Sequence, residues 1–186
     1  MLIVGITGTA GAGKGTIVAY LTRERGFRHY SVRGYLESRI RERGLPNNRD
    51  TMVALANDLR AQHGPSYLVM ELYAEARREG GDAVIESIRS PGEVTGLRGM
   101  GRFVLLGVDA PVEVRYARIV RRSSSTDLVS LEKFKADDAR EMTSTDPNHQ
   151  NIARCMKLAD YMICNEGTVE ALERQVGEII DAIRTE

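Results

Sequence analysis

The 186-residue sequence has no surplus of charge of either sign, since 26 lysine and arginine residues balance 26 aspartate and glutamate residues. A chain without net charge has no overall attraction to nucleic acid or to an anionic membrane surface. It holds only two cysteines, Cys155 and Cys164, which are too few for a disulfide framework or a four-cysteine zinc site. These deficits predict a cytoplasmic protein with neither nucleic acid nor a membrane as partner.

Long apolar runs are also missing. No stretch of 18 consecutive apolar residues occurs, so no membrane-spanning helix is expected. The apolar start at residues 1–6 is too short for a signal peptide. The chain shows no internal repeat and no low-complexity linker, and its length suits one globular domain with a sizeable core.

Lysine is scarce, with four residues against 22 arginines. Arginine presents a rigid fork that grips a phosphate group in two places, whereas lysine is a point charge. The number of arginines alone says little about function. Their positions relative to other motifs decide whether they serve phosphate chemistry.

Short apolar runs alternate with longer amphipathic segments. The pattern predicts strands at residues 2–6, 27–32, 83–85, 102–108 and 161–164. It predicts helices at residues 14–25, across 34–80 with breaks at 44–46 and 64–65, from 91, and at 111–122, 131–142, 151–158 and 168–184. Such alternation favours an α/β fold with a parallel sheet of about five strands flanked by helices, and ligands bind beyond the carboxyl ends of such strands.

The most informative segment runs from Gly8 to Thr16 and reads Gly-Thr-Ala-Gly-Ala-Gly-Lys-Gly-Thr. It fits the core of a phosphate-binding loop, directly after a strand and opening a helix. Backbone N–H groups of such a loop converge on a β-phosphate, Lys14 spans the β- and γ-phosphates, and the Thr16 hydroxyl faces Mg²⁺. The sequence therefore predicts ATP and Mg²⁺ as cofactors, with a nucleotide-binding set of Gly8, Ala10, Gly11, Ala12, Gly13, Lys14, Gly15 and Thr16.

Gly15 separates the lysine from the threonine. This Gly-Lys-Gly-Thr ending resembles adenylate kinases and other nucleoside monophosphate kinases, whereas dephospho-coenzyme A kinases place Ser or Thr directly after the lysine. The resemblance implies a three-layer P-loop NTPase fold in which residues 1–186 form a single kinase domain. It also implies a helical acceptor-binding insertion at about residues 34–80 and a short lid at about 122–130.

The segment from Glu86 to Arg89 resembles the Asp-Gly, apolar residue, Pro-Arg sequence that follows a strand in adenylate kinases. The resemblance implies that Arg89 binds the acceptor phosphate as a catalytic residue, and a structural ion pair is the alternative. Glu86 then orients Mg²⁺-bound water or accepts a hydrogen bond from an acceptor hydroxyl. Asp109, at the end of the next strand, competes for the magnesium role, with capping of the following helix as its alternative.

Arg33 follows the second predicted strand, where adenylate kinases carry an acceptor-binding segment. Glu37 stands where that family has an arginine. Arg33 is therefore expected either to reach the acceptor phosphate or to pair with Glu37 one helical turn away.

Residues 118–122 read Arg-Ile-Val-Arg-Arg and resemble the run with which adenylate kinases enter their lid. Arg118 and Arg122 share one helix face, and the resemblance implies that both contact the transferring phosphoryl group. Residues 135–140 resemble the basic-x-Asp-Asp element after the lid, which makes Arg140 a further candidate catalytic residue. A solvated basic helix end is the alternative for Arg118 and Arg122.

Residues 159–168 resemble the Ala-Asp, strand, Asn-x-Gly-Thr ending of dephospho-coenzyme A kinases and archaeal adenylate kinase-like proteins. In those proteins the loop lies near the donor adenine. The resemblance implies that Asn165 and Gly167 help to bind the cofactor, and a plain strand-end turn is the alternative.

These motifs together predict a magnesium-dependent enzyme that moves the γ-phosphoryl group of ATP to a nucleoside monophosphate. One alternative is transfer to a hydroxyl, as in dephospho-coenzyme A kinase, with Glu86 as the base. Another is a P-loop regulator with slow hydrolysis that uses the loop at residues 143–149 as a partner surface. Neither the acceptor base nor the oligomeric state follows from the sequence.

Overall fold

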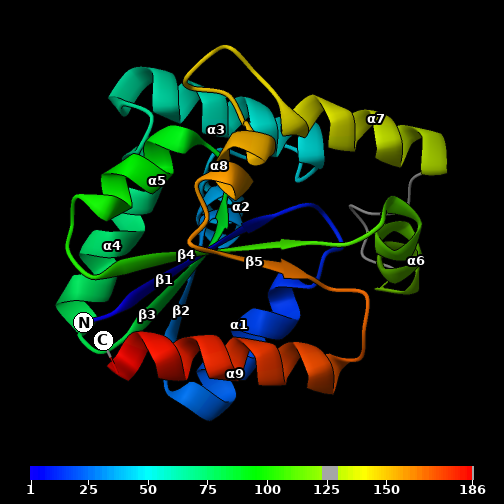
Figure 1. The fold of residues 1–186 in the computed structure, drawn as a ribbon. Coiled ribbons are helices and arrows are strands. Elements are labelled where there is room, and N and C mark those ends of the chain that lie inside the picture. The colour runs from blue at the N-terminus through cyan, green and yellow to red at the C-terminus, as the bar shows by residue number, and fades with distance from the viewer. Residues whose placement is uncertain (123–129, 186) are drawn as a thin grey trace.

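The computed structural model describes residues 1–122 and 130–185. Within them, five strands form one sheet in the order β2-β3-β1-β4-β5, and every neighbouring pair is parallel (Figure 1). The strands are β1 (Ile3–Gly8), β2 (Arg28–Ser31), β3 (Ala83–Ile88), β4 (Phe103–Asp109) and β5 (Tyr161–Cys164). The predicted sheet is confirmed, and β3 continues three residues further than the sequence pattern indicated.

Helices cover both faces of the sheet, as expected for a parallel sheet (Figure 1). One face carries α1 (Lys14–Arg25) and α9 (Val169–Thr185). The other face carries α2 (Val32–Glu42), α3 (Arg49–His63), α4 (Tyr67–Glu79), α5 (Pro91–Arg98) and α8 (Ile152–Lys157). The helices α6 (Val112–Arg122) and α7 (Leu131–Met142) lie at the end toward which the strands point. This is the three-layer P-loop NTPase kinase fold that the sequence predicted.

Local sequence explains where α3 and α5 begin. Asn48 starts α3 by accepting a hydrogen bond from the backbone N–H of Thr51 at 2.9 Å. Ser90 and Glu93 form a reciprocal capping box at the start of α5, where Pro91 takes a position that needs no N–H donor. Between β2 and β3 the helical stretch divides into α2, α3 and α4. The breaks fall at the predicted glycine–proline segments, residues 44–46 and 64–65.

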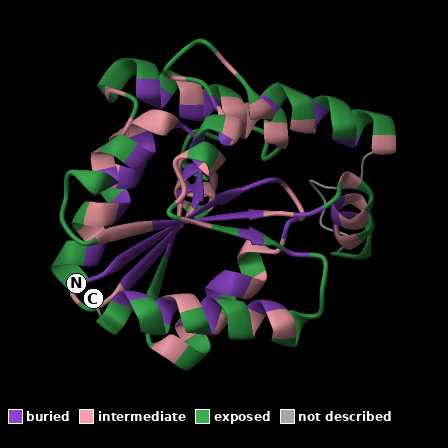
Figure 2. Cartoon of the chain, viewed as in Figure 1, coloured by how far each residue is buried: buried purple, intermediate pink, exposed green. Residues whose placement is uncertain are grey.

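Two apolar cores lie against the two faces of the sheet. Side chains from β1, β3 and β4 are almost entirely buried, because each strand is covered on both sides (Figure 2). The strands of α/β proteins read as continuous apolar runs for this reason. The rigid sheet places the loops at its carboxyl edge.

The start of β1 and the end of α9 lie at the opposite edge of the sheet. The N- and C-termini lie side by side in Figure 1. Asp82 ties them together, since its carboxylate accepts hydrogen bonds from the Leu2 N–H at 2.8 Å and from Arg184 at 3.0 Å.

β1 lies between β3 and β4, so the chain turns to opposite sides of the sheet at this point. Such a switch point opens a crevice at the carboxyl edge, and the glycine loop starts there. Next to it, β3 bulges, because Ile6 pairs with Glu86 whereas Thr7 pairs with Ile88. Ser87, the extra residue, has φ 67°, a left-handed conformation that costs a non-glycine residue about 1 kcal/mol.

None of the helices in the described part of the chain is both long enough and apolar enough to cross a bilayer. Most of the predicted lid, residues 123–129, lies outside the described residues.

Candidate nucleotide and acceptor site

Three glycines shape the loop between β1 and α1. Gly8, Gly11 and Gly13 have φ values of 138°, 81° and 112°. Residues other than glycine rarely adopt such positive φ values. A Cβ atom on Gly8 would lie 1.9 Å from the carbonyl oxygen of Val108, and one on Gly13 would lie 2.3 Å from the Asn165 side chain. The loop therefore requires glycine for conformation and for space, as a phosphate cradle does.

A buried arginine that the sequence analysis missed fastens this loop. Arg115 donates to the Ala10 carbonyl at 3.2 Å and to the Ala110 carbonyl at 2.8 Å. It also binds both carboxylate oxygens of Asp138 on α7, at 2.9 and 2.8 Å. Asp138 belongs to the predicted Asp-Asp element, so that acid supports the loop through Arg115.

Asn165 fastens the other side of the loop. Its side-chain amide donates to the Ala12 carbonyl at 2.8 Å, and its backbone N–H donates to the Asp109 carbonyl at 2.8 Å. Its own carbonyl accepts from Arg118 at 3.0 Å. Asn165 therefore holds the glycine loop, β4 and α6 together at the cavity, and its contact with the donor base stays a prediction.

Lys14 folds back over the loop. Its ammonium donates to the carbonyls of Gly8 at 2.9 Å and Thr9 at 2.7 Å. Burial, and next the positive charge of Arg89, lower the pKa of Lys14 to about 7. The lysine is therefore close to losing its proton at neutral pH, and an incoming phosphate group would restore the proton.

A cavity of about 590 Å³ opens at the carboxyl edge of the sheet, within the size range of small-molecule sites. It brings together the following predicted site residues: Ala10, Gly11, Gly13, Lys14, Gly15, Thr16, Arg33, Glu86, Arg89, Arg118, Arg122, Asn165 and Gly167. Four other candidates, Gly8, Ala12, Asp109 and Arg140, are not among its described lining residues. Apolar side chains of α2 and α3 cover the side opposite the loop, with Val32, Leu36, Met52, Val53 and Ala56 in the lining.

Glu86 lies at the cavity with its charge well supported. Its carboxylate accepts hydrogen bonds from Ser31 at 2.7 Å and Ser87 at 3.0 Å, and His29 lies 3.8 Å away. Burial opposes the charge, but the nearby imidazole of His29 and the hydrogen bonds from Ser31 and Ser87 outweigh it and lower the pKa of Glu86 to about 2. Asp109 instead accepts from Thr9 and from the Ala110 N–H. Glu86 is thus the better placed of the two carboxylates for a role at the cavity.

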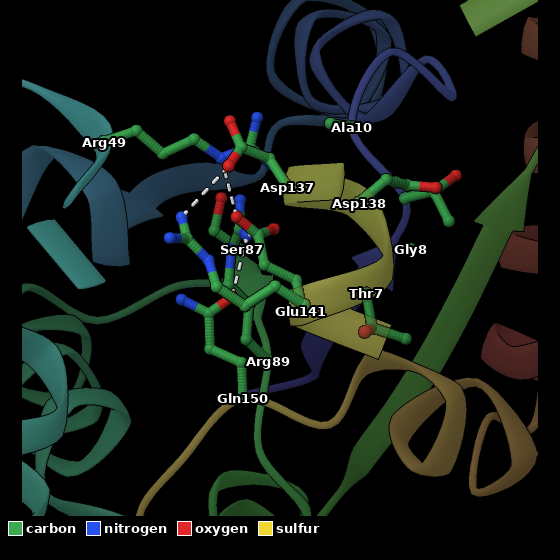
Figure 3. Close-up of polar contacts among 12 residues, drawn as sticks. Thr7, Gly8, Ala10, Arg49, Ser87, Arg89, Asp137, Asp138, Glu141 and Gln150 are labelled. Atoms are coloured by element: carbon green, nitrogen blue, oxygen red, sulfur yellow. Dashed lines mark hydrogen bonds and ion pairs between the residues drawn. The ribbon is translucent and has the colours of Figure 1, made fainter. Parts of the chain in front are cut away.

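Arg89 lies at the end of β3 in an ion-paired cluster (Figure 3). It donates to Glu141 of α7 and, at 3.2 Å, to Gln150. Arg49 of α3 donates to the same glutamate at 2.7 Å. Burial opposes the charge of Glu141, but Arg89 and Arg49 hold its pKa below the usual value. Sequence reasoning missed Arg49 and Glu141, because no motif marks either residue.

The remaining arginines differ in their surroundings. Arg33 lines the cavity and pairs with Glu37 at 2.8 Å, and its contact with an acceptor phosphate stays a prediction. Arg118 keeps one buried guanidinium nitrogen without a hydrogen-bond partner among the described residues. Arg140 pairs with Asp50 and Asp137 at 3.0 and 3.3 Å and lines a smaller hollow of about 270 Å³ beside the main cavity.

No group of three histidine, cysteine, aspartate or glutamate side chains in residues 1–122 and 130–185 is arranged to hold a metal ion by itself. Mg²⁺ commonly takes one or two protein oxygens and fills its other positions with water and substrate phosphates. Thr16 and Glu86 both line the cavity and offer such oxygens. The residues present thus fit a magnesium ion carried by a nucleotide.

Comparisons with known proteins agree with this geometry. The family described as AAA domain matches residues 4–143. A UPF0200 protein of Pyrobaculum aerophilum is 30% identical over 184 residues, covering 98% of each chain. The crystal structure of TT1252 from Thermus thermophilus is 25% identical with a TM-score of 0.63 and covers 97% of each chain. Shikimate kinase from Bacteroides thetaiotaomicron shares the fold, with 15% identity, a TM-score of 0.61 and coverage of 97% and 98%.

The matched family spans most of the chain, from β1 through the end of α7, and therefore includes the glycine loop and the clustered arginines. The full-length relatives extend the likeness through β5 and α9. With a P-loop kinase fold, the chain belongs to the family described as AAA domain and to the UPF0200 proteins.

Proposed function

We propose that this protein transfers the γ-phosphoryl group of ATP to the phosphate of a nucleoside monophosphate. One observation carries the proposal: a single cavity joins the glycine loop and Lys14 to an opposite wall with Arg49 and Arg89. The loop fits the phosphates of a donor, and guanidinium groups fit the phosphate of an acceptor. The apolar side chains of α2 and α3 supply a surface for an acceptor base.

The residues take distinct roles in this proposal. Loop N–H groups and Lys14 bind the donor phosphates, and Thr16 and Glu86 direct oxygens toward Mg²⁺, which neutralises charge on the phosphates when bound. Arg118 and Arg122 contact the transferring group from α6. Transfer proceeds in line, by positioning and charge neutralisation, without a covalent enzyme intermediate.

Glu86 favours a phosphate acceptor over a hydroxyl acceptor. A carboxylate with a pKa of about 2 is a weak base for removing a hydroxyl proton, whereas it stays ionised and suits Mg²⁺-bound water. Because the fold is similar to that of shikimate kinase, the experiment described below also includes acceptors that carry a hydroxyl group.

The proposal also assigns regions of the chain. Residues 34–80 form the acceptor cap and residues 122–130 a short lid on one kinase domain. Asn165 and Gly167 border the donor base, and Arg140 approaches the phosphates only when its side chain leaves Asp50 and Asp137, with which it is now paired. The enzyme is proposed to work in the cytoplasm on small nucleotides.

The test is ³¹P NMR of ATP and Mg²⁺ with the purified protein and a panel of acceptors. The panel holds nucleoside monophosphates, dephospho-coenzyme A and shikimate. Formation of ADP together with a nucleoside diphosphate supports the proposal. Phosphorylation of a hydroxyl, or ADP formation that needs no acceptor, contradicts it and favours the other two functions.

Replacing Arg89 with alanine is expected to raise the acceptor KM about 10- to 100-fold, because a charge-assisted contact to the acceptor phosphate is lost. The KM for ATP should change little. Steady-state kinetics with each substrate varied in turn measures both values. The matched control is Arg39→Ala, which removes an exposed arginine paired only on the surface of α2, and it should leave both KM values unchanged. An unchanged acceptor KM in Arg89→Ala would make Arg89 structural.

Binding of ATP and Mg²⁺ at pH 8 is expected to take up a large fraction of a proton per site, because free Lys14 with a pKa of about 7 is mostly neutral there. The bound phosphates raise that pKa and restore the ammonium. Titration calorimetry in two buffers of different ionisation enthalpy measures the uptake. At pH 6 the lysine already holds its proton, so the uptake should fall close to zero. Equal values at both pH values would contradict this prediction.

A further inference from the structure

A carboxylate without an assigned role lies between two cavity arginines. The side chain of Glu141, at the end of α7, is 3% exposed. One of its oxygens accepts from the Nε of Arg49 at 2.7 Å, and the other accepts from an Nη of Arg89 (Figure 3). A buried carboxylate with two guanidinium partners is costly to leave unpaired. Glu141 therefore fixes one arginine from the cap helix and one from the central sheet.

Each arginine keeps further donors beyond this contact. Among the hydrogen bonds of the described residues, none uses the two Nη atoms of Arg49 or the Nε and second Nη of Arg89. Both side chains line the main cavity and are about a quarter exposed, at 23% and 26%. A guanidinium held along one edge presents its remaining N–H groups in a fixed direction, which suits the oxygens of a phosphate.

The charges of this cluster do not cancel. Two guanidinium groups face one carboxylate, so the cluster attracts an anion even with Glu141 in place. Arg49 and Arg89 line the same cavity as Lys14, so the cluster faces the phosphates that the loop would hold. An anion bound here lies between the cap and the glycine loop.

We infer that Glu141 is the positioning residue that aims the guanidinium groups of Arg49 and Arg89, here called the clamp, at the acceptor phosphate. This inference rests on the proposed function and adds a residue that acts through the two arginines rather than on the phosphate itself.

The clamp can be tested without turnover. Inorganic phosphate is titrated against the wild-type protein whose loop is filled with ADP and Mg²⁺, and phenylglyoxal then modifies exposed arginines. Peptide mass spectrometry reads the modification of Arg49 and Arg89 separately. Phosphate is expected to protect both arginines together, with the same concentration dependence. Protection of neither arginine would overturn the clamp.

The variant Glu141→Gln separates positioning from charge. It makes the cluster more positive, so charge alone predicts that less phosphate is needed for protection. Loss of positioning instead predicts that about tenfold more phosphate is needed, and this is the expected result. A lower requirement would show that Glu141 merely competes with the anion, and it would overturn the positioning role.

Two further variants separate the geometry of the guanidinium group from its charge and provide a control. Arg49→Lys retains the charge but not the fork, so the phosphate needed to protect Arg89 should rise as it does in Glu141→Gln. Glu42→Gln is the matched control, because it breaks the exposed pair with Arg39 on α2 and should change nothing. Affinity for ADP and Mg²⁺ should stay at the wild-type value in every variant, which a general loss of structure would not allow.

The two proposals fail in different ways. If no acceptor is phosphorylated but phosphate still protects both arginines in a Glu141-dependent way, the clamp stands and the proposed function fails. If a nucleoside monophosphate is phosphorylated while phosphate protects neither arginine, the clamp alone is wrong.

Discussion

Replacing Lys14 with alanine is expected to lower the rate of phosphoryl transfer at least about 10³-fold, because a cation placed on the transferring phosphates supplies stabilisation of this size. No other lysine is available to substitute, since the remaining three lie at residues 133, 135 and 157. Single-turnover measurement with ATP, Mg²⁺ and the best acceptor of the panel gives the rate. Turnover within tenfold of the wild type would contradict the proposed site.

The protein should still fold when Lys14 is replaced by an uncharged residue. In the folded protein the pKa of Lys14 is lowered to about 7, so the unfolded chain binds more protons between pH 7 and the usual lysine value. Burying this lysine therefore costs stability, and that cost is greatest at and below pH 7. Lys14→Met should consequently be at least as stable as the wild type at pH 7, as thermal unfolding followed by circular dichroism can show. A lower Tm would mean that the bonds to the loop carbonyls outweigh the cost of burial.

Breaking the buried ion pair between Arg60 and Glu93 is expected to have the largest effect on stability. The two side chains are 1% and 0% exposed, and both Nε and one Nη of Arg60 donate to the same carboxylate oxygen, at 3.1 and 2.8 Å. Glu93→Gln leaves the guanidinium uncompensated, which costs about 3–5 kcal/mol. For a chain of this size the Tm should fall by roughly 10 °C, a shift that differential scanning calorimetry measures readily.

Two controls separate burial from loss of a charge pair. Glu42→Gln breaks the exposed pair with Arg39 and should cost less than about 1 kcal/mol. Combining Arg60→Met with Glu93→Gln removes the stranded charge, so the double variant should recover part of the lost Tm. If Glu93→Gln were no less stable than Glu42→Gln, the buried pair would contribute nothing.

Strand and helix order could be predicted because it depends on local patterns. Apolar runs marked the strands, and the glycine–proline breaks marked the ends of α2 and α3. β3 was predicted too short because Glu86 and Ser87 interrupt its apolar run, yet the bulge keeps both in the strand. A polar residue at a functional edge breaks the pattern that identifies a strand.

The loop and Arg89 could also be predicted, since each belongs to a contiguous motif. Arg49, Arg115 and Glu141 could not, because each acts through partners far along the chain. Glu141 lies 92 residues from Arg49 and 52 from Arg89, and Arg115 lies 105 residues from Ala10. Only the folded chain brings α3, β3 and α7 together, and no spacing in the sequence encodes that meeting.

The adjacency of the two termini has a practical consequence. Both ends lie at the edge of the sheet opposite the cavity, and Asp82 bonds to residues near each of them (Figure 1). A reporter protein fused at either end therefore points away from the cavity. The two ends can also be linked by a short peptide, and new ends can be opened in an exposed connection such as the one around Gly44. A chain permuted in this way should keep the same arrangement of the glycine loop and the cavity arginines, although its elements would be synthesised in another order.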